Sequence, residues 1–306
     1  CKSLTKLPDN LTSLINLTVL NLRGCTALTT LPGTLPNSLT GLNLEGCNAL
    51  TTLPGTLPNN LTKLNLEGCN ALKTLPGALP DNLTGLDLVF CTALTTLPDT
   101  LPDNLTKLDL AFCAALTTLP DTLPDKLTEL YLSFCTALTT LPDLPDSLTK
   151  LDLHDCTALT ALPDLPDSLT NLNLRGCNAL KTLPDTLPNS LTELDLRDCT
   201  ALTTLPDTLP DKLTELYLSF CTALTTLPDL PDSLTKLDLH DCTALTALPD
   251  LPDSLTKIFL SHCKSLTKLP DNLTSLINLT VLNLRGCTAL TTLPGTLPNS
   301  LTGLNL

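Results

Sequence analysis

Leucine alternates with polar residues in short stretches of this chain, and the stretches return at a nearly constant interval. One of them, residues 39–44, reads LTGLNL. Alternation with period two over a few residues is typical of a half-buried strand, and successive side chains of a strand point to opposite faces. We therefore expect Leu42 and Leu44 to point into a core, while Asn43 and the residues on either side of this leucine pair face outward.

The segment between two such stretches carries a different apolar pattern, Leu-Pro followed closely by a second Leu-Pro. Each proline lacks a backbone donor and disfavours helical backbone at the residue before it. This segment is therefore predicted to be extended or polyproline-like. A second inward row, such as Leu28 and Leu31, precedes it. Strand, turn and extended return make one coil of a right-handed solenoid with a parallel sheet on its concave face.

The coils form a repeat that covers the whole chain. Fourteen cysteines recur at intervals of 21, 22 or 24 residues, and a fixed period of this length indicates stacked supersecondary units. The 24-residue coils, 1–24 and 263–286, have room for a helical turn. Residues 115–170 recur unchanged at 201–256, and 1–44 recur at 263–306. We expect a single solenoid domain over 1–306, with about 14 coils and no cap at either end.

One cysteine per coil predicts a file of thiols along the stack. Neighbouring coils lie about 4.8 Å apart with parallel side-chain directions, whereas a disulfide needs Cβ atoms about 3.8 Å apart that face each other. Reduced thiols are therefore favoured over the alternatives, a metal site or a disulfide framework. Unpaired thiols favour a reducing intracellular compartment, although an extracellular filament stays open. The predicted structural ladder comprises Cys25, Cys47, Cys69, Cys91, Cys113, Cys135, Cys156, Cys177, Cys199, Cys221, Cys242 and Cys263.

Charge and motifs narrow the function classes. The net charge is −14, which argues against nucleic acid or an anionic membrane as partner, and no apolar run is long enough to insert into a bilayer. The chain has three histidines, no glycine-rich phosphate loop and no histidine cluster, so we expect no enzyme, cofactor or metal. Acidic pairs such as Asp143 and Asp146 are interpreted as a solvated surface in preference to weak calcium sites.

The repeat resembles that of the leucine-rich repeat family. The stretch from Leu39 to Leu50, LTGLNLEGCNAL, follows the family frame L-x-x-L-x-L-x-x-N/C-x-L with one slipped residue. Its continuation in 1–8, CKSLTKLP, is similar to repeats of plant disease-resistance receptors, and the doubled Leu-Pro is similar to repeats of bacterial effectors. The resemblance implies a leucine-rich-repeat solenoid, α/β by convention, with little or no helix. It also implies structural cysteines that hydrogen-bond the backbone of neighbouring coils.

Two surfaces are candidates for protein contact. On the sheet face, the middle outward column is Asn or Asp in most coils, for which lateral hydrogen bonding within the sheet competes with ligand contact. Phenylalanines precede the cysteine in three successive coils and are predicted to stack at one rim, covering the core edge or forming a sticky patch. The candidate sheet-face contacts are Tyr131, Asp109, Asp152, His154, Tyr217, Phe259, Arg175 and Arg197, and the candidate rim contacts are Phe90, Phe112 and Phe134.

These features predict a structural or protein-interaction scaffold. Uncapped solenoid ends expose apolar rows and an unpaired strand edge, and contact between two unlike ends does not close, so it builds a filament. End-to-end or lateral self-assembly is therefore the first hypothesis. The alternative is a receptor-like or effector-like module that binds a protein on the concave face.

Overall fold

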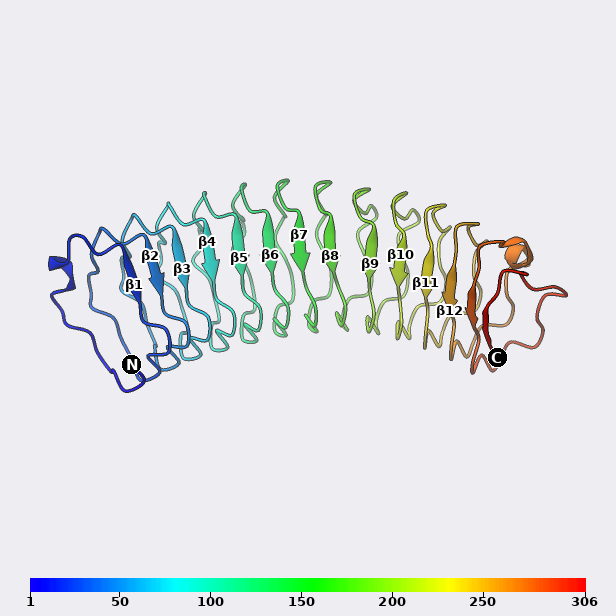
Figure 1. Cartoon of the computed structure of the whole chain (residues 1–306), viewed down its shortest axis with the longest axis horizontal. Helices are drawn as coiled ribbons and strands as arrows, with labels where there is room; N and C mark the ends of the chain where they lie inside the picture. The colour runs from blue at the N-terminus through cyan, green and yellow to red at the C-terminus, as the bar shows by residue number, and fades with distance from the viewer. The chain divides into compact units, whose positions relative to one another are not determined.

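The computed structural model describes all 306 residues and divides into two compact units, Cys1–Asp152 and Leu153–Leu306. Both units are built from coils that carry one short strand each, drawn as arrows in Figure 1. All of the strands are three residues long and parallel to their paired neighbours, and no α-helix is present. The architecture is the predicted parallel β-solenoid.

In the first unit, neighbouring strands pair in chain order without any shift in register. Leu20 lies opposite Leu42, and Leu42 lies opposite Leu64. A 3-10 turn, η1 (Leu11–Ser13), occupies the long first coil. The strands are β1 (Val19–Asn21), β2 (Gly41–Asn43), β3 (Lys63–Asn65), β4 (Gly85–Asp87), β5 (Lys107–Asp109), β6 (Glu129–Tyr131) and β7 (Lys150–Asp152).

The second unit repeats this arrangement. Leu216 lies opposite Leu237, which lies opposite Ile258. The second long coil holds the 3-10 turn η2 (Asp271–Ser275). The strands are β8 (Asn171–Asn173), β9 (Glu193–Asp195), β10 (Glu215–Tyr217), β11 (Lys236–Asp238), β12 (Lys257–Phe259), β13 (Val281–Asn283) and β14 (Gly303–Asn305).

The core of each unit consists of stacked leucine rows. The central leucine of a strand and the leucine after it, for example Leu108 and Leu110, are fully buried, and so is the row represented by Leu116. Burying one leucine side chain stabilises a fold by about 1.5–3 kcal/mol. Because each row continues through successive coils, a coil is stable only when its neighbours cover it.

Apart from the turns η1 and η2, the return segments are neither helix nor strand, and they are tied together by hydrogen bonds. In the coils with two Leu-Pro pairs, the carbonyl of the second proline accepts from the leucine three residues later, as in Leu105 N–H to Pro102 O at 3.0 Å. Threonines bridge neighbouring coils, as in Thr106 Oγ1 to Thr84 O at 3.0 Å. The prolines keep the return segments out of the sheet, but the backbone polar groups of these segments are still hydrogen-bonded.

The cysteines lie at the turn after each strand with no disulfide between them. Their thiols donate to a leucine carbonyl of the preceding coil, as in Cys47 Sγ to Leu22 O at 3.3 Å and Cys113 Sγ to Leu88 O at 3.2 Å. Burial raises the pKa of the Cys91 thiol to about 12. These thiols therefore act as neutral donors that fasten one coil to the next.

Candidate functional site on the exposed sheet face

The exposed face of the sheet presents the first and third residues of every strand. Where the third residue is Asn or Asp, its side-chain oxygen accepts the backbone N–H two residues further on. Examples are Asn43 Oδ1 with Glu45 N at 2.9 Å and Asn173 Oδ1 with Arg175 N at 3.2 Å. The predicted lateral bonding occurs at Asp152, whose Oδ2 accepts from Ser133 Oγ of the preceding coil at 3.4 Å. Most of the column instead bonds the nearest unpaired donor, which lies in the same chain just past the strand, an arrangement that Asx side chains favour. The column is mainly a strand-end cap.

In three coils an aromatic residue stands in place of the capping Asn or Asp, namely Tyr131, Tyr217 and Phe259. An aromatic ring offers no oxygen to the N–H that Asn or Asp would bind, and one such hydrogen bond contributes about 1 kcal/mol. Tyrosine instead adds a large apolar ring with a polar tip to the exposed face. At these three positions the sheet face therefore lacks the strand-end cap that Asn or Asp provides in most other coils.

Tyr131 forms the centre of a cluster in the first unit. Its hydroxyl donates to Glu129 Oε2 at 3.0 Å, Lys150 Nζ lies 3.3 Å from Glu129 Oε1, and Lys107 Nζ lies 5.0 Å from the centre of the tyrosine ring. Burial, together with the bond to Glu129, raises the pKa of Tyr131 to about 12. The same hydrogen bond lowers the pKa of Glu129, so both groups keep their charge states at neutral pH.

Two predicted contacts flank this ring by strand register, since Asp109 and Asp152 lie opposite Tyr131 on the neighbouring strands. Burial raises the pKa of Asp109, although the Ala111 N–H and Lys107 oppose the rise. His154 belongs to the second unit, where its Nε2 lies 3.1 Å from Asp155 Oδ2. Glu129 was missed by the sequence argument, yet its place two residues before Tyr131 on the same face was a usable signal.

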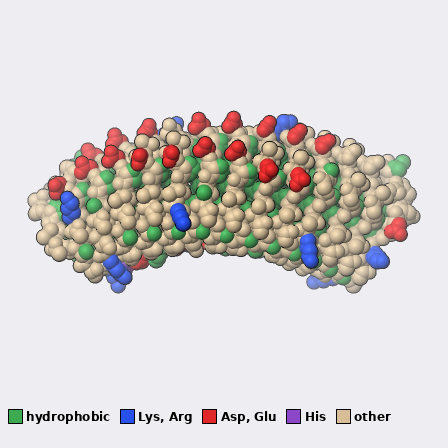
Figure 2. Space-filling model, turned by 180° about the vertical axis from the view of Figure 1, so that it is seen from behind, with side chains coloured by type: hydrophobic (Ala, Val, Ile, Leu, Met, Phe, Trp, Pro, Cys, Tyr) green, Lys and Arg blue, Asp and Glu red, His purple; other side chains and the backbone are tan.

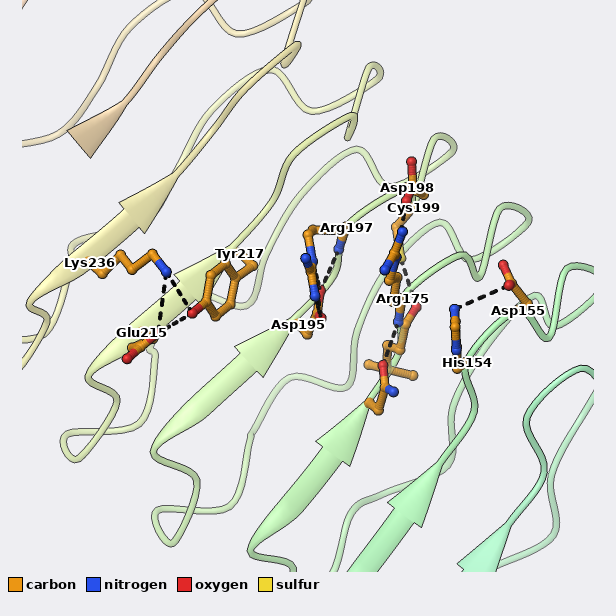
Figure 3. A network of polar contacts seen from close by, with 12 residues as sticks. His154, Asp155, Arg175, Asp195, Arg197, Asp198, Cys199, Glu215, Tyr217 and Lys236 are labelled. Carbon is orange, nitrogen blue, oxygen red and sulfur yellow. Dashed lines mark hydrogen bonds and ion pairs between the residues drawn. The ribbon is translucent and has the colours of Figure 1, made fainter. Parts of the chain in front are cut away.

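Tyr217 has the corresponding position in the second unit and a more complete set of contacts (Figure 3). Its hydroxyl donates to Glu215 and accepts from Lys236 Nζ at 2.8 Å. Lys236 Nζ lies 4.4 Å and the Arg197 guanidinium 5.3 Å from the ring centre. Arg197 is held by Asp195, with Nε 2.9 Å from Oδ1. Two cations therefore flank one half-buried aromatic ring, an arrangement stabilised by cation–π attraction.

The remaining predicted contacts in the second unit lie in separate places. Arg175 pairs with Asp198, Nε to Oδ2 at 3.3 Å, beside the Tyr217 cluster (Figure 3). Phe259 lines an open hollow of about 470 Å³ together with Lys236 and His240. A second hollow, of about 500 Å³, lies in the first unit, where Gly41 and Gly85 leave space around Lys63. Both hollows are shallow openings on the sheet face.

The rim phenylalanines stack as predicted. The ring centres of Phe90 and Phe112 are 4.3 Å apart at 19°, and those of Phe112 and Phe134 are 4.4 Å apart at 8°. All three residues have positive φ, as do Gly46 and Gly68 at the equivalent place in earlier coils. This left-handed backbone was not predicted from the sequence. Its signal was the glycine that most often precedes the cysteine in the first coils, since glycine is the default residue at positive φ.

The acidic surface also bears on which kind of partner the protein can bind. Acidic side chains gather in rows on the face drawn in Figure 2, and the return loops expose Asp99, Asp103, Asp121 and Asp125. No three or more histidine, cysteine or acidic side chains are grouped so that they could hold a metal ion. None of the helical segments has the length and apolar character needed to cross a membrane.

Comparison with known proteins identifies the fold. No protein-family model and no curated protein sequence matches the chain. Among solved structures, a leucine-rich repeat protein from Bacteroides ovatus is similar with a TM-score of 0.60 at 21% identity, covering 94% of this chain and 78% of that one. The leucine-rich effector protein YopM from Yersinia pestis is similar with a TM-score of 0.55 at 29% identity, covering 94% and 88%. With its repeat frame and one parallel strand per coil, the chain has the fold of these leucine-rich repeat proteins.

Proposed function

We propose that this chain is a non-enzymatic interaction scaffold that binds a protein partner on the exposed face of its sheet, with Tyr131 and Tyr217 as anchors. The observation that carries the proposal is the exchange of a structural Asn or Asp for a half-buried tyrosine on the outward face of each unit. Solenoid repeat proteins use their extended concave surfaces for binding, and the similar solved structures are leucine-rich repeat proteins. A residue that weakens its own strand end is best explained by what it contributes to binding.

The chemistry of the face suits a protein better than a small molecule. Small ligands are enclosed by deep, mostly apolar pockets, whereas the hollows here open widely onto a flat sheet. Tyrosine and arginine are enriched among residues that dominate protein–protein binding energy. The ion pairs around Tyr217 hold Arg197 and Lys236 in fixed positions, which lowers the entropy lost when a partner covers them.

The charge of the chain selects the kind of partner. With a net charge of −14, the protein attracts basic surfaces over distance and accelerates their association at low salt. We therefore infer a partner with a basic contact surface and at least one apolar or aromatic group that packs on the tyrosine rings.

The test uses a matched pair of double variants. Proteins captured by the wild-type chain from an extract are identified and purified, and their affinity is then measured by calorimetry. Tyr131→Asn with Tyr217→Asn restores the cap of the other coils, so it keeps the fold, and it is expected to weaken binding at least 100-fold. Asp121→Asn with Asp207→Asn changes two exposed loop positions and serves as the control. If both double variants bind a partner as tightly as the wild type, the sheet face is not the binding surface.

A second candidate is end-to-end assembly of copies into a filament. Residues 263–306 repeat 1–44 without change. Leu42 and Leu44 are 2% and 0% exposed beneath the following coil, while their counterparts Leu304 and Leu306 are 45% and 67% exposed. The surface that fits these leucines is thus another coil of this type. Sedimentation velocity over a hundredfold concentration range tests this candidate. Growing species support assembly, and a single monomeric species at every concentration contradicts it.

A further inference from the structure

The residue before each cysteine after Cys1 adopts left-handed backbone, whether it is glycine, aspartate, histidine or phenylalanine. The three rim phenylalanines have φ values of 59°, 64° and 61°. Bulky side chains are genuine outliers in this region, because the Cβ atom crowds the backbone, a strain that glycine avoids. Three consecutive phenylalanines therefore occupy the position of the repeat that suits them least, and strain of this kind gathers at binding sites.

The stack ends at Phe90 on the side of the preceding coil. Phe112 covers one face of the Phe90 ring at 4.3 Å. At the equivalent position of the preceding coil stands Gly68, which has no side chain to cover the other face. Phe90 is accordingly 43% exposed, one of the few large apolar side chains at the surface.

The space over Gly68 is bounded by backbone and one small polar group. A Cβ atom placed on Gly68 would have as its nearest neighbours the Cα and N of Gly46, at 3.6 Å, and the Asn48 side-chain amide, at 3.9 Å. Gly46 likewise brings no side chain into this region. A flat group can therefore approach the open face of the Phe90 ring without displacing a side chain of its own coil or of the coil before it.

We propose that the open face of Phe90, above Gly68, is a binding site for one planar aromatic side chain of a protein partner. The incoming ring adds a fourth layer to the Phe90–Phe112–Phe134 stack, whose two existing pairs set the geometry at 4.3 and 4.4 Å. Ring stacking of this offset kind is favourable beyond simple burial of apolar surface. A nucleic-acid base offers the same planar face, but the net charge of −14 repels its phosphates. This site is separate from the tyrosine anchors of the sheet face.

The site can be probed with a single aromatic group. N-acetyl-tryptophanamide is neutral and planar, and its indole protons report contact with the protein in saturation-transfer difference NMR. We expect saturable transfer at millimolar probe concentration, as fits one stacked ring, and at least tenfold less transfer to N-acetyl-leucinamide, which is apolar but not planar. Equal transfer to both probes would overturn the proposal, because it would mean a non-specific apolar surface.

Three glycine variants locate the site. Gly68→Asp places a non-aromatic side chain in the slot, at a backbone conformation that Asp155, Asp198 and Asp241 already adopt, so that no new ring face is opened, and is expected to reduce probe affinity at least tenfold. Gly46→Phe places a ring on the far side of the slot, so that the probe is sandwiched, and is expected to raise affinity at least threefold. Gly24→Asp makes the same change as Gly68→Asp away from the slot and is expected to have no effect.

A variant that removes the ring covers the case in which a side chain added at Gly68 disturbs folding. Phe90→Asp introduces the residue that stands at this position as Asp155, Asp198 and Asp241. It removes the ring, keeps a side chain over the face of Phe112, and is expected to lose binding while the circular dichroism spectrum stays unchanged. Probe binding that survives in both Gly68→Asp and Phe90→Asp would refute the site. Loss in both, together with tighter binding by Gly46→Phe, would establish it.

Discussion

Alkaline pH is expected to unfold this protein through its buried thiols. Ten cysteines have a pKa raised above the ordinary value of 9.0, with burial the main cause in nine of them and a hydrogen bond with Cys287 the first cause for Cys263. The pKa rises to about 11 for Cys47 and to about 12 for Cys91. The folded protein therefore keeps its thiol protons at a pH where the unfolded chain loses them. Stability is full below pH 9 and is lost as the pH rises through the interval between the two pKa values.

The magnitude follows from proton linkage. Each thiol that is ionised only in the unfolded chain lowers the free energy of unfolding by about 1.4 kcal/mol per pH unit. Between pH 8 and pH 10 this amounts to about 1.4 kcal/mol per thiol, because ionisation in the unfolded chain begins only near pH 9. Five of the ten thiols lie in the first unit, which loses about 7 kcal/mol. In the second unit the loss at Cys263 is offset by Cys287, whose pKa is lowered to about 7 by its hydrogen bond with Cys263, so the other four thiols account for a loss of about 6 kcal/mol. A domain has about 5–15 kcal/mol in total, and we therefore expect unfolding close to pH 10.

The assay is urea unfolding followed by circular dichroism at pH 8, 9, 9.5 and 10, in the presence of a reductant. The urea midpoint is expected to fall steeply above pH 9 while the slope of the transition stays constant. Cys113→Ala removes one of the five thiols of its unit and should make the fall shallower by about 1.4 kcal/mol between pH 8 and 10. A free energy of unfolding that is unchanged from pH 8 to pH 10 would refute the reasoning, since it would mean that the thiols ionise in place.

Three further predictions concern single side chains. In urea unfolding, Phe112→Gly should lower stability by about 1 kcal/mol more than Phe90→Gly. Both variants relieve the strain of one residue at positive φ, but the first breaks two ring pairs and the second only one. Equal effects would mean that stacking contributes nothing to stability. Asn65→Ala should lower the free energy of unfolding by about 1 kcal/mol and Asn65→Asp should leave it almost unchanged, because Asp accepts the same N–H bond. Equal losses of stability in thermal unfolding would contradict the capping role of this residue. Leu108→Ala should cost about 3–5 kcal/mol from a fully buried position, and a cost below about 1 kcal/mol would contradict a tightly packed core.

Much of the fold could be predicted from the sequence because the same pattern of leucine, proline and polar positions occurs in nearly every coil. Alternation in 39–44 gives the inward direction of Leu42, and the prolines exclude helix from the return segment. Both follow from local sterics and side-chain periodicity, which need no knowledge of distant contacts. The two helical turns also fall in the two longest coils, where extra residues had to be accommodated.

The details of the surface were harder to predict because they depend on backbone direction at single residues. The partner of Asn43 is the N–H of Glu45 along the same chain, a geometry set by how the strand ends and not by its alternation. The pairing of Tyr217 with two cations likewise depends on which side chains of neighbouring strands reach the ring. Register makes Asp195 and Asp238 its neighbours, but only the coordinates reveal that Arg197 and Lys236 turn toward it.

The repeat itself restricts where a function can be encoded. Replacing an inward leucine opens a cavity, replacing a cysteine removes a bond between coils, and replacing a strand-end Asn or Asp removes a cap, so substitutions at these positions weaken the fold. Two kinds of position nonetheless vary in a way that lowers local stability, the tyrosines that displace a cap and the phenylalanines held at positive φ. Both put aromatic rings at the surface of a chain that has only seven Phe and Tyr residues in 306. Because aromatic side chains dominate protein interfaces, the concentration of these few rings at structurally unfavourable positions is the strongest reason to seek the partner there.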